Sequence, residues 1–188
     1  MEEIVKYIFE AGMLKRTARS GWWAEKVNHP ESVADHCFRA AVVAFVLARM
    51  EGHDEAFANR LCTAAVFHDM HEARLGDMNK ITQRYINMKE YEDRVEEDQV
   101  RKMPKELGKS ILSVLDELGD EEKRILKDAD YLECAFQAKE YVDIGHKGAA
   151  SWLESIDGRL QTKSAKKLMG QLKKQDSNSW WKGLKKID

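Results

Sequence analysis

The sequence predicts an all-α protein. Apolar residues recur at helical spacing along most of the chain, no strand-like alternation persists, and the only prolines are Pro30 and Pro104. Apolar residues make up 43% of the chain and charged residues 34%, which is typical of a soluble globular protein. With 188 residues, the chain is long enough for one domain with a real core and short for two. We therefore expect a single domain over residues 1–188.

The first helix is predicted from apolar residues that share one helical face: Ile4, Val5, Ile8, Phe9 and Leu14. Residues 14–31, LKRTARSGWWAEKVNHPE, show no regular period and predict a long connection. A connection of this length inside a compact domain is usually functional or disordered, and its two adjacent tryptophans argue against disorder.

Two more helices are predicted before residue 70. Ser32 and Asp35 resemble a capping box at the start of a mostly apolar helix that ends at Gly52. Asp54 is expected to cap the next helix. One stripe of that helix carries Phe57, Leu61, Ala64 or Ala65, and His68.

The second half of the chain predicts more helices. Residues 79–103 are mostly charged and predict a loop and an exposed helix, and Pro104 suits the first turn of a helix over residues 105–118. Asp120 is expected to cap a long helix that stops at Gly145. Two short helices are expected after Ala149, within a C-terminal region over residues 149–188. The amphipathic tail over residues 178–188 is expected to pack on the domain or on a second subunit.

The composition favours a cytoplasmic protein that binds neither polymeric nucleic acid nor membranes. The net charge is −2, and the late basic cluster over residues 163–175 is typical of a solvated helix face. Cys37, Cys62 and Cys134 are odd in number and widely spaced, so we interpret them as reduced packing thiols. The N-terminus does not resemble a signal peptide, and no apolar run is long enough to cross a membrane.

Polar side chains interrupt three apolar helices. His68 and Asp69 end one apolar run, His36 begins another, and Asp128 and Asp130 lie inside a third. Buried unpaired imidazoles and carboxylates are costly, and a divalent metal would compensate for their lost hydration. The alternative is that each is a satisfied core residue, since a His-Asp dipeptide is common by chance. Helical geometry does not choose between Asp128 and Asp130.

Glu72 follows His68 by four residues and is predicted on the same helix face. It could act as a general acid or base beside a metal centre. The alternative is an exposed glutamate that pairs with Arg74. His71 does not complete an H-E-x-x-H zinc-protease motif, and we interpret it as a surface residue or as support for the metal ligands.

Four motifs in order give the chain a family resemblance: R-x-G-W at residues 19–22, E-S-V-A-D-H at 31–36, H-D-x-x-E-x-x-x-G-D at 68–77 and A-D at 129–130. The chain resembles the HD-domain superfamily of metal-dependent phosphohydrolases, and within it the 5′-deoxynucleotidases, over about residues 5–145. The resemblance implies a compact helical HD-domain fold and a homodimer. It also implies that the substrate is a deoxyribonucleoside 5′-monophosphate.

The resemblance assigns roles residue by residue. It implies a divalent transition metal such as Mn²⁺ or Co²⁺, held by four ligands: His36, His68, Asp69 and Asp130. It implies Glu72 and Asp77 as catalytic residues, with Asp77 also near the substrate. Arg19 would bind the phosphate and Trp22 would lie beside the sugar. The spacing of R-x-G-W leaves open whether Trp22 or Trp23 takes that place, and His71 stands where the family usually has a small residue.

Two other functions stay open at this point. One is a different HD-type reaction, such as hydrolysis of a cyclic nucleotide or an alarmone by a phosphodiesterase. The other is a non-catalytic helical dimerisation protein. The retention of all four implied metal ligands together with Glu72 argues against the second alternative.

Overall fold

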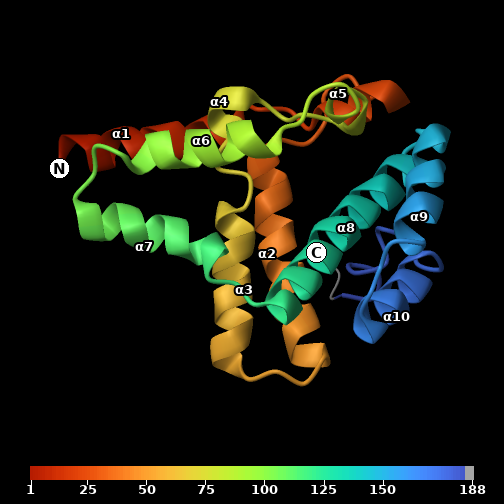
Figure 1. Ribbon diagram of the computed structural model, residues 1–188. Helices are drawn as coiled ribbons and strands as arrows, with labels where there is room; N and C mark the ends of the chain where they lie inside the picture. Colours follow the sequence, from red (N-terminus) through yellow and green to blue (C-terminus); the bar gives the residue numbers. More distant parts are fainter. Residues whose placement is uncertain (185–188) are drawn as a thin grey trace.

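The computed structural model describes residues 1–184, and over that range it contains ten α-helices, three short 3-10 helices and no β-strand (Figure 1). This confirms the predicted all-α class. The centre is an antiparallel pair, α2 (Val33–Met50) and α3 (Glu55–Phe67), with the long helix α8 (Asp120–Asp143) packed against both.

The remaining helices lie on two sides of this centre. On one side are α1 (Glu2–Ala11), α6 (Lys89–Val100) and α7 (Lys105–Asp116), and on the other α9 (Ala150–Asp157) and α10 (Lys163–Leu172) pack on α8 (Figure 1). Two one-turn helices, α4 (Glu72–Leu75) and α5 (Lys80–Gln83), follow α3. The functional motifs therefore lie around one end of the α2–α3 pair.

The core forms where α2, α3 and α8 meet. Leu47, Leu61, Ile125 and Leu132 have no exposed surface. Burying an aliphatic side chain of this size stabilises the fold by about 1.5–3 kcal/mol. These residues come from all three central helices, so the same contacts that form the core also fix the helices that carry the polar motifs.

The predicted caps are mostly confirmed. Ser32 Oγ accepts from Asp35 N and Asp35 accepts from Ser32 N, and Asp54 accepts from Phe57 N at 2.8 Å. The prediction for Asp120 is wrong. The N-cap is Gly119, and its N–H donates to Glu122, which reaches back from the first turn, so that Asp120 is the first helical residue.

The predicted position of Pro104 relative to its helix is also wrong by one residue. It is the N-cap of α7 and not part of its first turn. The capping position needs no helical dihedrals, and the N–H that proline lacks would have no intrahelical partner there.

The segment over residues 14–31 is more regular than predicted. It contains the second half of a 3-10 helix at Gly12–Lys15 and all of a second one at Ser20–Glu25, and an isolated antiparallel bridge joins Ala18 to Ser32. Short 3-10 turns leave no repeating apolar pattern, so periodicity could not reveal them. The bridge holds Arg19 beside the start of α2.

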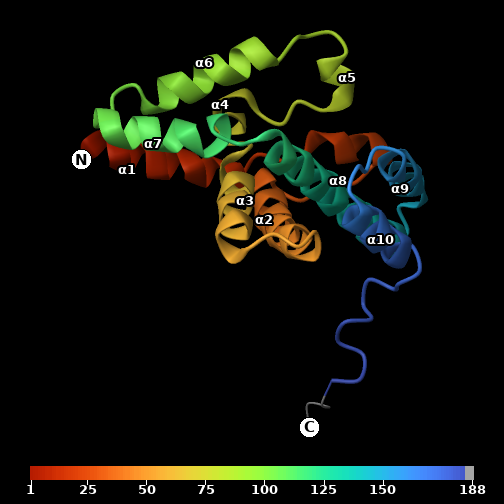
Figure 2. The same cartoon turned by 60° about the horizontal axis from the view of Figure 1, so that its bottom comes forward.

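The C-terminal segment extends away from the helices (Figure 2). Trp180 and Trp181 are 76% and 51% exposed, so the predicted packing of the tail on the domain is not seen for the described residues. The last part of that predicted tail, residues 185–188, lies outside the described residues. Cys37, Cys62 and Cys134 are free thiols, and none of the helices described is long and apolar enough to cross a membrane.

Candidate metal and catalytic site

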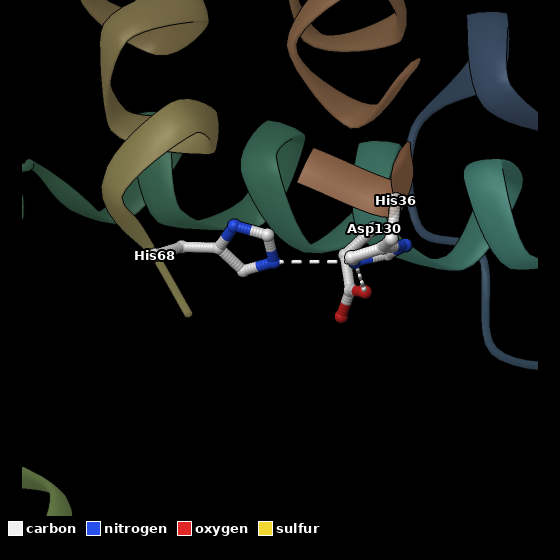
Figure 3. A group of neighbouring side chains, drawn as sticks. All are labelled: His36, His68 and Asp130. Carbon is white, nitrogen blue, oxygen red and sulfur yellow. Dashed lines mark hydrogen bonds and ion pairs between the residues drawn. The ribbon is translucent and has the colours of Figure 1, made fainter. Parts of the chain in front are cut away.

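The rings of His36 and His68 point their Nε2 edges toward each other at the centre of the candidate site (Figure 3). Nδ1 of His36 contacts Glu133, and Nδ1 of His68 lies 2.8 Å from Ala65 O. Both partners are acceptors, which places a hydrogen on each Nδ1. The two Nε2 atoms lie 3.4 Å apart and therefore present lone pairs to the same point.

Two carboxylates reach the same point. Asp130 Oδ1 lies 3.3 Å from His36 Nε2, and Asp69 Oδ2 lies 3.3 Å from His68 Nε2 and 3.7 Å from His36 Nε2. Asp69 Oδ2 is buried and has no hydrogen-bond partner. Four lone-pair donors thus converge, and a divalent cation would satisfy all of them. The four side chains come from α2, the end of α3, the turn after it, and α8.

The local electrostatics favour a positive charge at this point. Burial disfavours the charged His36 ring, but the carboxylates of Asp130 and Glu133 outweigh burial and raise the pKa of His36 to about 10. Burial of Asp130 is likewise outweighed by His36 and Lys127, which hold the pKa of Asp130 well below its usual value. A metal ion can replace the proton that these residues would otherwise share.

The structure separates Asp128 from Asp130. Asp128 is fully buried and points away from the histidines, where it accepts from Gln161 N at 2.9 Å and from Thr162 N at 2.7 Å. It anchors the connection between α9 and α10. Asp130 is therefore the aspartate of α8 that faces the histidines.

Glu72 lies beside this cluster with an unsatisfied oxygen. Its side chain is buried, and Oε2 has no hydrogen-bond partner. Burial, together with the nearby charges of Asp69 and Asp77, raises the pKa of Glu72 to about 9. The alternative pairing of Glu72 with Arg74 is not found, because Arg74 binds Glu10 at 2.5 Å and Asp98 at 3.0 Å.

Arg19 lies beside Asp69 and is held by Asp77. Arg19 Nη1 donates to Asp77 at 3.0 Å and lies 3.6 Å from Asp69 Oδ2. Asp77 also accepts from the backbone N–H and the hydroxyl of Ser20, each at 2.7 Å. Gly76, just before Asp77, has a φ of +75°, a conformation that favours glycine. Asp77 thereby ties the loop that carries Arg19 to the His-Asp motif.

The two adjacent tryptophans have different environments. Trp22 is only 2% exposed, packs on the rings of Trp152 and Tyr141, and donates from Nε1 to Glu31 at 3.0 Å. Trp23 is 56% exposed. Contact of Trp22 with a sugar stays a prediction, because most of its ring is already covered by protein.

His71 points toward α6 and not toward the facing histidines. Its Nδ1 lies 3.0 Å from Glu96 and its Nε2 4.0 Å from Glu92. Its position between the His-Asp doublet and α6 suits a residue that connects the two elements.

Sequence reasoning did not single out Arg39 and Glu133, which lie directly behind His36. Glu133 has no exposed surface, and it contacts both His36 and Arg39. The available signal was spacing: Arg39 follows His36 by three residues, and Glu133 follows Asp130 by three, so each pair shares a helix face.

Comparisons with known proteins agree with the motifs. A family model for the HD domain matches residues 11–173. The 5′-deoxynucleotidase HDDC2 of Homo sapiens is 30% identical over 186 residues, which cover 94% of this chain and 87% of the human protein.

Solved structures have the same architecture. The crystal structure of genomics APC5600 is 38% identical, with a TM-score of 0.79 over 97% of this chain and 100% of that one. The Cyanophage S-2L HD phosphohydrolase DatZ, bound to dA and one catalytic Zn²⁺ ion, is 16% identical, with a TM-score of 0.58 over 88% of this chain and 94% of that one. At that identity the likeness to the phage protein shows the fold alone.

Proposed function

This chain belongs to the HD-domain family, and we propose that it is a metal-dependent phosphohydrolase that releases phosphate from deoxyribonucleoside 5′-monophosphates. One observation carries the proposal: two imidazoles and two carboxylates from different segments converge, beside a buried carboxyl without a partner and an arginine. The similarity to 5′-deoxynucleotidases of several organisms supports this choice of substrate.

We propose four metal ligands: His36, His68, Asp69 and Asp130. When bound there, a divalent ion would supply Lewis acidity for phosphate-ester hydrolysis. Mixed imidazole and carboxylate ligands suit Mn²⁺ or Co²⁺, which we expect, and they also suit Zn²⁺.

Glu72 is the proposed catalytic acid. Burial and the charges of Asp69 and Asp77 raise the pKa of Glu72, which favours the protonated carboxyl. Glu72 can then give its proton to the 5′-oxygen as the bond from that oxygen to phosphorus breaks. Water supplies the hydroxyl that phosphorus gains, and its other proton returns to the Glu72 carboxylate. The products are a nucleoside with a 5′-hydroxyl and inorganic phosphate, and Glu72 is again protonated.

Arg19 is the proposed phosphate-binding residue. A planar guanidinium can bind two phosphate oxygens at once. Asp77 acts by holding Arg19 and Ser20, which orients the guanidinium toward the metal ligands. We propose that Trp22 supports sugar recognition, and its small exposed edge leaves Trp23 as the alternative on the same loop.

A substrate panel tests the proposal. Purified protein is incubated with dAMP, AMP or cyclic AMP and with Mn²⁺, Co²⁺ or Zn²⁺. Released phosphate is measured for dAMP and AMP, and conversion of cyclic AMP to AMP is followed by chromatography, because opening the cyclic ester releases no inorganic phosphate. We expect turnover of dAMP that exceeds that of AMP and is lost in His68→Ala but kept in the surface control His29→Ala. Turnover of cyclic AMP alone would favour a phosphodiesterase, and no turnover with a bound metal would favour a non-catalytic protein.

The cellular location and the assembly state stay predictions. We expect a cytoplasmic homodimer. Helix α2 exposes an apolar stripe that a second copy could cover, formed by Phe38, Val42, Val46 and Met50. Analytical ultracentrifugation of the wild type and of Val42→Glu checks the assembly state, and a monomeric wild type would contradict it.

A further inference from the structure

We infer that an ion pair between the partly buried Arg39 and the fully buried Glu133 positions His36 for metal binding. We also infer that Arg39 joins this pair to the loop that carries Trp22. Neither residue touches the proposed reaction centre, so both are positioning residues. The inference rests on the proposed metal centre and adds the residues that hold one of its ligands in place.

Glu133 is held at both of its oxygens. Oε2 contacts Nδ1 of His36, and Oε1 accepts from Arg39 Nε at 2.8 Å. The side chains of Glu133 and His36 are both fully buried, so no water competes for these contacts. A carboxylate fixed at both ends fixes the plane of the imidazole, and it leaves Nε2 as the atom that can bind a metal.

Arg39 supplies the charge that Glu133 needs in this environment. A buried carboxylate is costly unless it is paired, and the arginine fork pairs with several acceptors at once. Nη1 donates to Glu140 at 2.8 Å and Nη2 donates to Gln137 at 2.5 Å. Glu133, Gln137 and Glu140 form one stripe of α8, so Arg39 also sets how α2 lies along α8.

The same guanidinium approaches the loop before α2. Arg39 Nη2 lies 3.8 Å from Glu31 Oε2, while Glu31 Oε1 accepts from Nε1 of Trp22 at 3.0 Å. The Arg39 guanidinium thus lies between the carboxylates of Glu133 and Glu31. Glu133 contacts a proposed metal ligand, and Glu31 contacts the loop that carries Trp22. A shift of Arg39 would disturb both.

The sharpest test uses two substitutions of the same kind at two partners of Arg39. Glu133→Gln keeps the shape of the side chain, but its amide nitrogen is a donor that must face either the N–H of His36 or that of Arg39. Glu140→Gln removes the charge of a 44% exposed partner of Arg39 and leaves the contacts of Glu133 unchanged. Arg39→Lys keeps the charge and loses the fork, which gives a third variant if Glu133→Gln fails to fold.

Metal binding is measured directly, by titration of metal-free protein with Co²⁺ followed through its visible absorption spectrum. We expect Glu133→Gln to weaken Co²⁺ binding by about 10–100-fold and to change the spectrum. Arg39→Lys should weaken binding less, and Glu140→Gln should match the wild type. Circular dichroism and thermal unfolding without metal establish that each variant is folded. At saturating Co²⁺, kcat for dAMP should return toward that of the wild type, as expected for positioning and not for chemistry.

Two outcomes separate this inference from the proposed function. If folded Glu133→Gln and Arg39→Lys both bind Co²⁺ as tightly as a wild type that hydrolyses dAMP, the positioning inference is wrong and the proposed function stands. If the wild type itself binds no divalent metal and hydrolyses no nucleotide, the proposed function is wrong and the inference is overturned with it.

Discussion

Asp128 and Asp130 lie two residues apart on α8 and face different parts of the molecule. Asp128 accepts backbone hydrogen bonds from the connection between α9 and α10, whereas Asp130 faces His36 and Lys127. A rotation of about 200° along a helix separates neighbours of this kind. The same side-chain chemistry is therefore available to stabilise the fold at one position and, at the other, to contribute to the proposed metal site.

Substitution of each aspartate in turn should separate the effect on stability from the effect on metal binding. Asp128→Ala leaves buried N–H groups unpaired, and hydrogen bonds to a charged group contribute about 1.5–3 kcal/mol each, so the free energy of unfolding should fall by several kcal/mol. Asp130→Asn should lose metal binding with a much smaller change in unfolding. Urea unfolding and Co²⁺ titration of both variants check this, and equal effects in both would contradict the separation.

Glu72→Gln tests whether the Glu72 carboxyl donates a proton in the reaction. The amide keeps the shape of the carboxyl but cannot give up a proton at neutral pH, so kcat for dAMP should fall by about 10²–10⁴-fold, the usual contribution of general acid–base catalysis. Bound metal is measured in the same samples by elemental analysis and should be unchanged. Normal turnover in this variant would remove Glu72 from the mechanism.

The sequence singled out residues that the structure brings together, but it did not single out the residues that support them. His36, His68 and Asp69 attract notice because polar residues are rare within apolar helices, and the choice of Asp130 came from family resemblance. Glu133 and Arg39 sit at ordinary helical positions, and their importance appears only when α2 lies against α8. Which face of α8 meets α2 is a tertiary property that a single sequence does not display.

At the scale of the element, α2 depends on its N-terminal cap. Ser32 and Asp35 exchange hydrogen bonds one turn before His36 comes into the site. Ser32→Ala removes the acceptor for Asp35 N, and loss of such a cap typically costs about 1 kcal/mol. We expect the unfolding free energy to fall by about that amount, measured by urea unfolding. Ser151→Ala, at an exposed hydroxyl of α9, is the control and should change it less.

Helix positions were predictable where periodicity and caps agree. Ser32 and Asp54 mark the starts of α2 and α3 correctly because both residues have side chains that satisfy free N–H groups. Asp120 had the right chemistry for a cap, but Glu122 reaches back to Gly119 and the helix starts one residue earlier than expected. The 3-10 helix at Ser20–Glu25 was missed because it is too short to show a period.

At the scale of the whole molecule, the candidate site joins segments that are far apart in the chain. Arg19 lies before α2, the His-Asp motif follows α3, and Asp130 lies in the middle of α8. The complete arrangement does not exist in the unfolded chain, so a metal that needs all four side chains binds the folded state. Metal affinity and global stability are therefore linked.

Removal of the metal should lower the stability of the whole protein. A ligand present at about 100 times its Kd stabilises the folded state by about 2.7 kcal/mol, so treatment with EDTA should lower Tm and addition of Mn²⁺ or Co²⁺ should restore it. The shift should depend on metal concentration. His68→Ala lacks one proposed ligand and should show a much smaller shift, whereas the surface variant His29→Ala should behave like the wild type. If protein made metal-free with EDTA shows no rise in Tm when Mn²⁺ or Co²⁺ is added, the four side chains do not hold an ion.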